Sequence, residues 1–329
     1  MTGKCTQNET GVGRLDHMPR PHLALFRTLW GCDAHAAYAA SGSFAEKAAL
    51  LRRAGYDGVE ASLADLGGTV DERAAAVDAL RSEGMELIVG TYSSWCDYDE
   101  SNWIDLHSGV DAQLERFEAQ LADVDALGAE GVLRRINAHS GSDAWSEDES
   151  HRYFSAALPL AESKAAAPVS HETHRGRPLA NPFTCQRLCL ALPTLRLTLD
   201  ASHWFLVCER LIGAAGSSGS YERDVLQRIC ERVDHIHARV GTPEAPQVAA
   251  LGGGSAWEVL ATEAHEALWC DVWSAARERG AAELSATPEY GPAPYTPMKP
   301  GAAGTPLTDV WEVTNDAARR LRQLHSDLD

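Results

Sequence analysis

Residues 169–177 read VSHETHRGR and follow a short run of mostly small apolar residues, 165–168. A short apolar run that leads directly into histidine, glutamate and arginine is typical of a buried strand whose end carries chemistry. Three later stretches have the same form: 195–200 followed by ASHW, 233–239, and 282–287 followed by PEYGP. The sequence therefore predicts four buried strands that each end in polar side chains.

The ends of these four strands supply carboxylates and imidazoles. They offer Glu172, Asp200 with His203, His237 and Glu289. Oxygen ligands together with one or two imidazoles suit a divalent ion such as Mn²⁺, Mg²⁺, Co²⁺ or Zn²⁺. A structural salt bridge with a nearby arginine would explain any one of these groups alone. Four of them at successive strand ends favour a metal site, because crowded charges are costly unless they are paired or bound to an ion.

Strands and helices alternate along most of the chain. The expected strands are 23–29, 57–61, 85–91, 131–136, the strand that carries Glu172, 195–200, the strand of His235 and His237, and 282–287. The expected helices are 43–54, with Ser43 as N-cap, then 70–82, 110–127, 147–164, 182–191, 204–212, 221–232, 257–279 and 308–324. This alternation predicts an α/β fold with a parallel sheet, closed as a single (β/α)₈ TIM barrel. An open doubly wound sheet usually carries a glycine-rich turn after its first strand, and LWGC at 29–32 is not that turn.

The first 21 residues lack the alternation of strands and helices that is expected for the rest of the chain. Residues 1–21 are polar, contain several turn-forming residues and lack the apolar segment of a signal peptide. We expect them to form a flexible N-terminal tail that is dispensable for folding. Residues 22–329 are expected to form the catalytic domain.

Composition narrows the function classes. The 329 residues are 44% hydrophobic, which is ample for one large core, and the formal net charge is -18. An acidic surface of this kind disfavours binding to nucleic acid and to anionic membranes. The 8 cysteines are scattered with no CxxC pair, which suggests free thiols and a cytoplasmic location. A homo-oligomer is compatible with the sequence.

Further polar or aromatic residues near strand ends are candidates for binding the substrate. They are Glu60, His139, His174, His203, Trp204 and Arg239. His235 and His237 point to the same face of their strand, because they are two residues apart. Only His237, which is nearer the carboxyl end of the strand, can reach an ion bound there. His237 is therefore the predicted ligand.

These motifs resemble those of the sugar phosphate isomerase/epimerase superfamily, the xylose isomerase-like TIM-barrel proteins, over roughly residues 22–325. The resemblance rests on HETHRGR at 171–177, DASHW at 200–204, HIHARVG at 235–241 and PEYGP at 288–292. It implies one divalent ion held by Glu172, Asp200, His237 and Glu289. It also implies that the two glutamates move the proton and that His203 contacts the substrate.

The chain departs from the ketose epimerases of that superfamily at two positions. Those enzymes place a second glutamate six residues after the first metal glutamate, where this chain has Pro178. They place an arginine six residues after the metal histidine, where this chain has Pro243, so Arg239 would have to substitute from a different position.

Three functional hypotheses follow. The first is an isomerase or epimerase that removes a proton next to a carbonyl of a sugar, polyol ketone or related compound, through an enediolate, with Glu172 and Glu289 as the proton-transfer groups. The second is a metal-dependent hydrolase, lyase or dehydratase on the same barrel, including endonuclease-like relatives. The third is a barrel that binds a sugar without catalysis.

Overall fold

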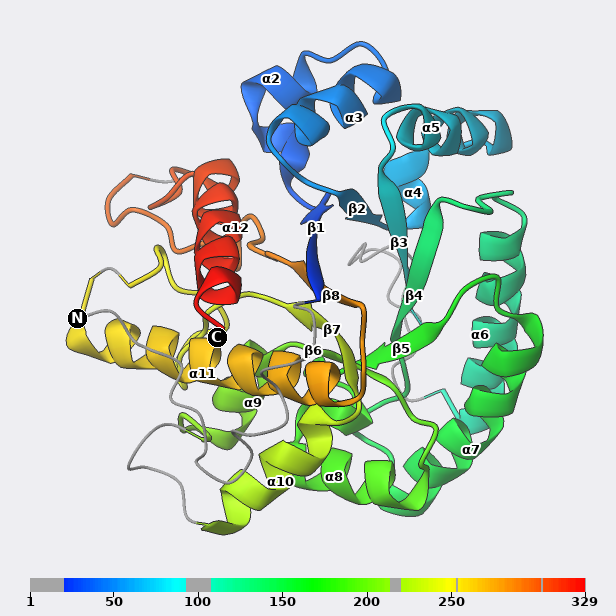
Figure 1. The fold of residues 1–329 in the computed structure, drawn as a ribbon, viewed down its shortest axis with the longest axis vertical. Coiled ribbons are helices and arrows are strands. Elements are labelled where there is room, and N and C mark those ends of the chain that lie inside the picture. The colour runs from blue at the N-terminus through cyan, green and yellow to red at the C-terminus, as the bar shows by residue number, and fades with distance from the viewer. Residues whose placement is uncertain (1–20, 93–107, 214–219, 253, 303, 329) are drawn as a thin grey trace.

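Eight parallel strands form a closed barrel in the computed structural model, which describes residues 21–92, 108–213, 220–252, 254–302 and 304–328. Figure 1 shows the strands at the centre and helices around the outside. The strands pair in chain order, and β8 closes the barrel against β1 with Leu25 opposite Ala286. The prediction of a (β/α)₈ TIM barrel is confirmed.

The strands and helices lie close to their expected positions. The strands are β1 His22–Thr28, β2 Gly58–Ala61, β3 Glu86–Tyr92, β4 Leu133–His139, β5 Val169–Glu172, β6 Leu197–Leu199, β7 Val233–His237 and β8 Glu283–Thr287. The helices are α2 Ala36–Ala39, α3 Phe44–Arg53, α4 Leu63–Leu66, α5 Val70–Ser82, α6 Val110–Asp125, α7 Glu147–Lys164, α8 Pro182–Ala191, α9 Ala201–Cys208, α10 Ser220–Cys230, α11 Ala256–Glu278 and α12 Val310–Ser326. Short 3-10 helices cover Cys32–Ala34 and Pro178–Ala180.

Two boundaries differ from the prediction in ways that affect the mouth of the barrel. Strand β4 was expected to end at Ile136 but continues to His139, because its backbone keeps pairing with β3 as far as Tyr92. Helix α9 was expected to begin at residue 204 but begins at Ala201. The Asp200 side chain accepts a hydrogen bond from the Ser202 amide and caps the helix there.

Capping by short polar side chains explains other helix starts. The expected N-cap Ser43 accepts a hydrogen bond from the Glu46 amide at the start of α3. Full capping boxes, in which the third helical residue also accepts from the N-cap amide, begin α5, at Thr69 and Glu72, and α7, at Ser146 and Glu149. These local signals agree with the apolar periodicity, which is why several helix bounds could be predicted closely.

The barrel interior is apolar at one end and polar at the other. Ala24, Phe26 and Ile88 form a small buried cluster inside the sheet. Gly58 makes room for this cluster, since a Cβ there would lie 2.4 Å from the Phe26 ring. Thr28 lies two residues beyond Phe26 on the same strand face and lines the pocket at the mouth.

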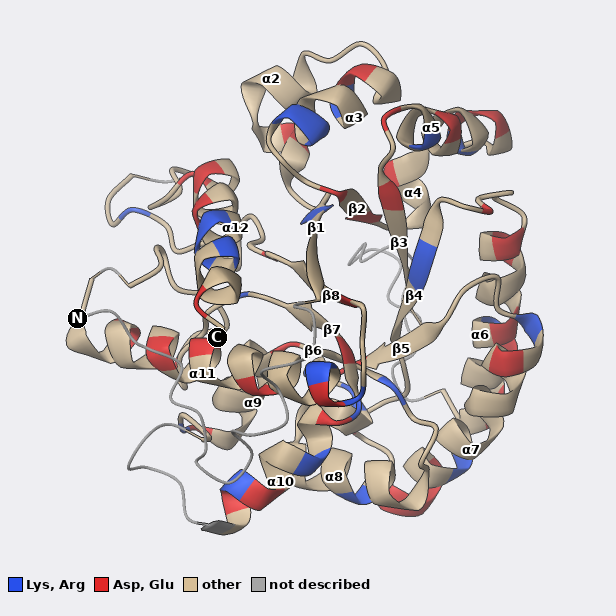
Figure 2. Cartoon of the chain, in the orientation of Figure 1, with Lys and Arg blue, Asp and Glu red and all other residues tan. Residues whose placement is uncertain are grey.

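The outer helices carry charged residues of both signs. Figure 2 shows carboxylates and basic residues interspersed on helices such as α5, α6 and α12. Among the described residues, no helix combines the length and apolar character needed to cross a bilayer.

Five of the cysteines have free thiols: Cys32, Cys185, Cys189, Cys208 and Cys230. Cys270 is instead disulfide-bonded, so the expectation of free thiols is wrong for Cys270. The predicted tail falls almost entirely on residues 1–20, outside the described residues, and stays a prediction.

Candidate metal and substrate site

The four predicted metal ligands come together at the carboxyl end of the barrel. Glu172 ends β5, Asp200 follows β6, His237 ends β7 and Glu289 lies just after β8. Each offers one ligand atom, and these atoms all lie within 4.8 Å of one another. The closed barrel thus brings four separate strand ends to one point.

The centre of this group is suited to a cation. The Nδ1 atom of His237 lies 3.4 Å from Glu172 Oε1 and 3.3 Å from Glu289 Oε2. Both His237 Nδ1 and Glu172 Oε1 are buried, and neither has a hydrogen-bond partner among the described residues. Burial lowers the pKa of His237, but attraction to Glu289, Glu60 and Glu172 raises it well above its usual value. A divalent ion would satisfy these atoms and replace the proton, so the residues fit a metal.

Arg239 is part of the same charged group. Its guanidinium forms a close ion pair with Asp200 and lies 3.5 Å from Glu289. It also donates to the Ser202 hydroxyl at 3.2 Å and to His203 Nε2 at 3.0 Å. Arg239 therefore holds two of the proposed metal ligands as well as lining the pocket.

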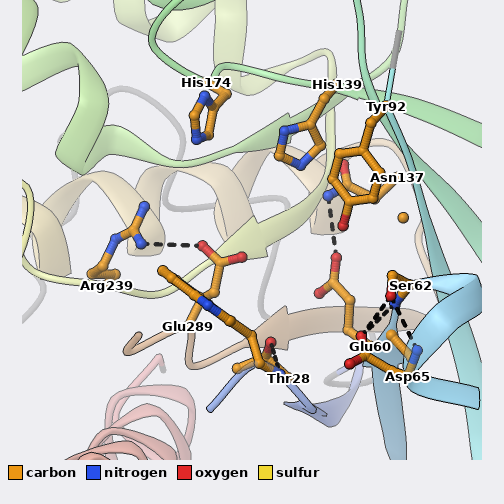
Figure 3. Close-up of a pocket in the computed structure, with 13 residues that line it drawn as sticks. Thr28, Glu60, Ser62, Asp65, Tyr92, Asn137, His139, His174, Arg239 and Glu289 are labelled. Carbon is orange, nitrogen blue, oxygen red and sulfur yellow. Dashed lines mark hydrogen bonds and ion pairs between the residues drawn. The ribbon is translucent and has the colours of Figure 1, made fainter. Parts of the chain in front are cut away.

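A pocket opens directly above this group. It is lined by Thr28, Trp30, Glu60, Ala61, Ser62, Asp65, Gly90, Tyr92, Asn137, His139, His174, Arg239 and Glu289. Figure 3 shows Arg239 pointing toward Glu289 and Asn137 reaching Glu60 across the pocket. The predicted substrate residues Glu60, His139, His174 and Arg239 all line it, and so does the proposed base Glu289.

Glu172 and Glu289 differ in electrostatic environment. Burial raises the pKa of Glu172, but attraction to His139 and His237 outweighs this and leaves the pKa well below its usual value. His139 Nε2 lies 2.7 Å from Glu172 Oε2, and the Asn137 amide donates to the same oxygen at 2.9 Å. Burial dominates at Glu289 and raises its pKa. Two carboxyl groups with opposite shifts are suited to exchange roles as base and acid.

Two more histidines are held as neutral rings. Burial and neighbouring positive groups lower the pKa of His174 and of His203 well below the usual value. His174 Nδ1 lies 2.5 Å from the Arg175 carbonyl, so this nitrogen carries the proton and Nε2 carries the lone pair. His203 Nε2 faces the guanidinium of Arg239, which can only donate, so the proton of His203 lies on Nδ1.

Several polar residues of the site were not predicted as substrate contacts. Asn137, Tyr92 and Thr28 each follow the inward period-two pattern of their strands, which was the available signal. Ser62 and Asp65 form the capping box of α4 at the pocket wall, where Asp65 accepts from the Ser62 amide and hydroxyl. A short S-x-x-D motif after a strand is common, so it did not point to a site.

Trp204 does not lie where a substrate contact was expected. Its side chain is fully buried in the core, and its indole nitrogen donates to the carbonyl of Leu179, in the 3-10 helix after β5, at 2.9 Å. The early start of α9 turns this residue away from the mouth and into the core. We therefore correct that expectation and leave Trp204 out of the proposed site.

Comparison with known proteins places the fold. No family model and no curated protein matches the sequence. Among solved structures, the 3-keto-D-glucoside 4-epimerase from E. coli aligns with a TM-score of 0.52 and 12% identity, covering 92% of this chain and 99% of that one. A probable 3-DHS dehydratase of petrobactin synthesis from Bacillus anthracis aligns with a TM-score of 0.54 and 12% identity, covering 92% and 98%. The IOLI protein with a zinc atom aligns with a TM-score of 0.53 and 14% identity, covering 93% and 99%.

These similarities extend over the barrel as a whole. At such low identity they establish architecture and leave the reaction of this chain to its own residues. A structure described as a sugar phosphate isomerase/epimerase from Parabacteroides distasonis aligns with a TM-score of 0.51 and 12% identity, covering 92% of this chain and 94% of that one. The (β/α)₈ barrel of this chain is therefore similar in fold to structures described as a putative xylose isomerase and as a sugar phosphate isomerase/epimerase.

Proposed function

We propose that the protein is a divalent-metal-dependent isomerase or epimerase that acts on a sugar or a related hydroxy-carbonyl compound. One observation carries the proposal. Glu172 and Glu289 face the same imidazole nitrogen of His237, at 3.4 and 3.3 Å, and Glu289 also lines the pocket. A site that moves a proton between two faces of a carbon needs two such groups.

The ion would be held by the four side chains that meet at the mouth of the barrel, those of Glu172, Asp200, His237 and Glu289. A bound divalent ion supplies Lewis-acid polarisation of a carbonyl and stabilises negative charge that develops on oxygen. The ionised carboxylate takes the proton from the carbon next to the carbonyl, and the C–H electron pair forms the carbon–carbon double bond of an enediolate. The other carboxyl group returns a proton to the opposite face, which gives the epimer, or to the neighbouring carbon, which gives the isomer.

The remaining pocket residues would orient hydroxyl groups. His174 lines the pocket and presents a lone pair on Nε2 as an acceptor, whereas the neighbouring His203, whose ring centroid lies 4.0 Å away, is fully buried and does not line the pocket. Arg239 adds a guanidinium beside Glu289. A polyhydroxylated substrate matches alternating donors and acceptors of this kind. The sugar epimerase among the similar structures supports the same substrate class.

Metal analysis and proton exchange test the proposal together. We expect the purified chain to retain about one divalent ion that chelators remove. A panel of ketoses, aldoses and 3-keto-glycosides in heavy water should include a compound that gains deuterium next to its carbonyl only in the presence of enzyme and ion. A chain that binds the ion but exchanges no proton with any member would contradict the isomerase assignment.

A second candidate, a hydrolase or dehydratase, is supported by a separate observation. His139, Glu172 and His174 also offer ligand atoms within 4.8 Å of one another, next to the first group. Hydrolases with two ions use a bridging carboxylate between them, and Glu172 belongs to both groups. Two ions per chain in the metal analysis, or loss of water from a substrate without deuterium exchange into recovered substrate, would favour this candidate.

A further inference from the structure

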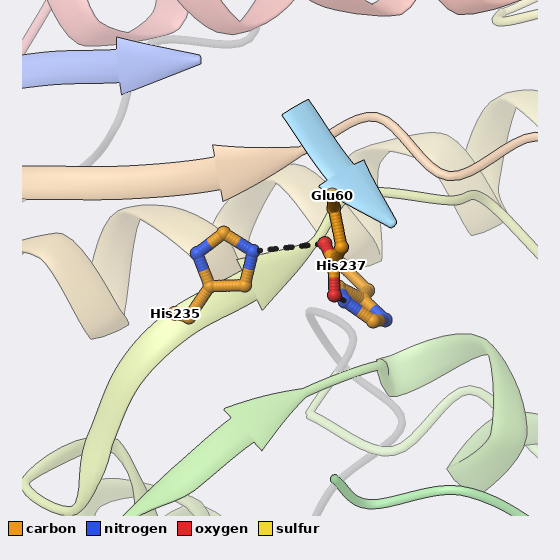
Figure 4. Close-up of side chains that lie close together, drawn as sticks. All are labelled: Glu60, His235 and His237. Atoms are coloured by element: carbon orange, nitrogen blue, oxygen red, sulfur yellow. Dashed lines mark hydrogen bonds and ion pairs between the residues drawn. The ribbon is translucent and has the colours of Figure 1, made fainter. Parts of the chain in front are cut away.

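Glu60 was expected near a strand end, but its contact with His237 was not predicted from the sequence. It lies on β2, which does not carry a proposed metal ligand, and its side chain is buried at the floor of the pocket. One carboxylate oxygen, Oε1, lies 2.9 Å from His237 Nε2. Figure 4 shows the Glu60 carboxylate between the rings of His235 and His237. Glu60 therefore contacts the proposed metal histidine from the side opposite the other ligands.

The contacts of Glu60 leave its carboxylate little freedom. The hydroxyl of Thr287 donates to Oε2 at 2.5 Å, and the amide of Asn137 donates to Oε1 at 3.1 Å. Thr287 and His237 are paired opposite one another in β8 and β7, so the strand register places both partners at one level. His235 in turn contacts Thr287 at 3.0 Å and the Ser285 hydroxyl at 2.8 Å, which holds the layer beneath.

These contacts determine where the proton of a neutral His237 lies. A carboxylate can only accept, so the nitrogen at 2.9 Å from Glu60, Nε2, carries the hydrogen. The amide orientation of Asn137 is consistent, because its Nδ2 donates to Glu60 Oε1 and to Glu172 Oε2, where an oxygen would be repelled. The lone pair is then on Nδ1, which faces Glu172 and Glu289.

We infer that Glu60 is a positioning residue, which holds the Nε2 hydrogen of His237 and thereby presents the Nδ1 lone pair to a divalent ion. This inference rests on the proposed metal site. Glu60 also lines the pocket, so the expectation that it binds the substrate stays a prediction beside this role. Metal-binding histidines commonly donate their second N–H to a carboxylate, and loss of that partner typically weakens metal affinity by about 10–100-fold.

The test compares Glu60→Ala with Glu60→Gln in the full chain, using Zn²⁺ and Mn²⁺ in competition with a chelator. Glu60→Ala should weaken the affinity for either ion by about 10–100-fold, because Nε2 loses its acceptor. Glu60→Gln keeps an acceptor oxygen at the same place and should recover most of the loss. Circular dichroism before and after removal of the ion checks that each variant is folded.

A spectroscopic measurement makes the test independent of folding defects. Long-range ¹H–¹⁵N spectra of the Zn²⁺-loaded wild-type protein should show His237 with hydrogen on Nε2 and the metal on Nδ1. Hydrogen on Nδ1, or a Glu60→Ala variant that binds both ions as the wild type does and changes only KM, would overturn the inference. A wild-type chain that binds no ion would instead refute the proposed metal site itself, so the two failures are distinguishable.

Discussion

The two histidines of β7 provide the sharpest test of the metal site. His237→Ala and His235→Ala make the same chemical change two residues apart on one strand. His237 Nδ1 faces Glu172 Oε1 and Glu289 Oε2 at 3.4 and 3.3 Å and has no hydrogen-bond partner among the described residues. Both ring nitrogens of His235 instead contact hydroxyl groups, at 2.8 and 3.0 Å. We expect only the first variant to lose the ion.

The two substitutions should affect different quantities: His237→Ala the affinity for the ion, and His235→Ala the free energy of unfolding. Loss of a group that merely supports a ligand costs about 10–100-fold in affinity, so loss of the ligand His237 should cost at least about 100-fold, or about 2.7 kcal/mol. In His235→Ala the Ser285 hydroxyl keeps its contact with the Asp234 carbonyl, and Thr287 keeps its bond to Glu60. The free energy of unfolding should fall by about 1–3 kcal/mol, because a small buried space and weakened hydrogen bonds remain. The affinity of His235→Ala for the ion should stay within about tenfold of the wild type.

Two measurements separate these effects. Chelator competition gives the metal affinity of each variant, and urea unfolding of the metal-free proteins gives their stability. Equal loss of the ion in both variants would show that β7 supports the site only through packing. Loss of the ion in His235→Ala alone would place the ion one layer deeper, at the group of Glu60, His235 and His237.

Four other predictions follow from the same contacts. Glu289→Gln should retain the ion at saturating Mn²⁺, but its rate of proton exchange, measured by deuterium uptake, should fall by about 10²–10⁴-fold because the amide is not a base. Full rescue of that rate by excess ion would show that Glu289 is only a ligand. Arg239→Leu should destabilise the metal-free protein by about 3–5 kcal/mol in urea unfolding, because Asp200 and Glu289 lose their buried guanidinium, and added Mn²⁺ should restore part of the loss. Because the pKa of His237 is raised in the folded protein, protonated His237 should stabilise the metal-free protein fully below about pH 6.5, and this stability should be lost as pH rises through the folded pKa. The affinity for the ion should rise over the same range, since the ion displaces the proton. Urea unfolding and ion titrations between pH 6 and 9 check both trends. Trp204→Ala should cost about 3–5 kcal/mol in unfolding free energy with little change in metal affinity, and a selective loss of the ion would return Trp204 to the site.

Most of the fold could be predicted because local and long-range signals coincide. Helices α7 and α8 have the expected bounds, since a capping box begins α7 and the Asn181 cap followed by proline begins α8. Strand β4 was predicted too short because Asn137 and His139 are polar, and polarity alone suggested a loop. Pairing with both β3 and β5 carries the strand onward, and that pairing is not visible in a single segment.

The meeting of the four candidate ligands at one point could be predicted because each lies at the end of an apolar strand. Glu60 was recognised as a residue of the site, but its contact with His237 was not predicted. The two residues are separated by 177 positions and meet only because β2 and β7 belong to one closed barrel. Trp204 illustrates the opposite error, since its position after a strand suggested the mouth, while the Asp200 cap starts the helix early and directs the indole into the core.

The charge of the site supports a resident cation more strongly than any single ligand does. Four carboxylates, those of Glu60, Glu172, Asp200 and Glu289, lie around His237 or Arg239 at the barrel mouth. With all four ionised, the guanidinium and a protonated His237 balance two of these charges and His139 contacts a third at Glu172, while burial raises the pKa of Glu289 because its charge is costly there. Replacing the Nδ1 proton of the imidazolium by a divalent ion, while Nε2 keeps its hydrogen, adds a further positive charge where the unpartnered atoms lie. The proton on His237 and the ion therefore compete for one place, which is why metal binding by this chain should release a proton.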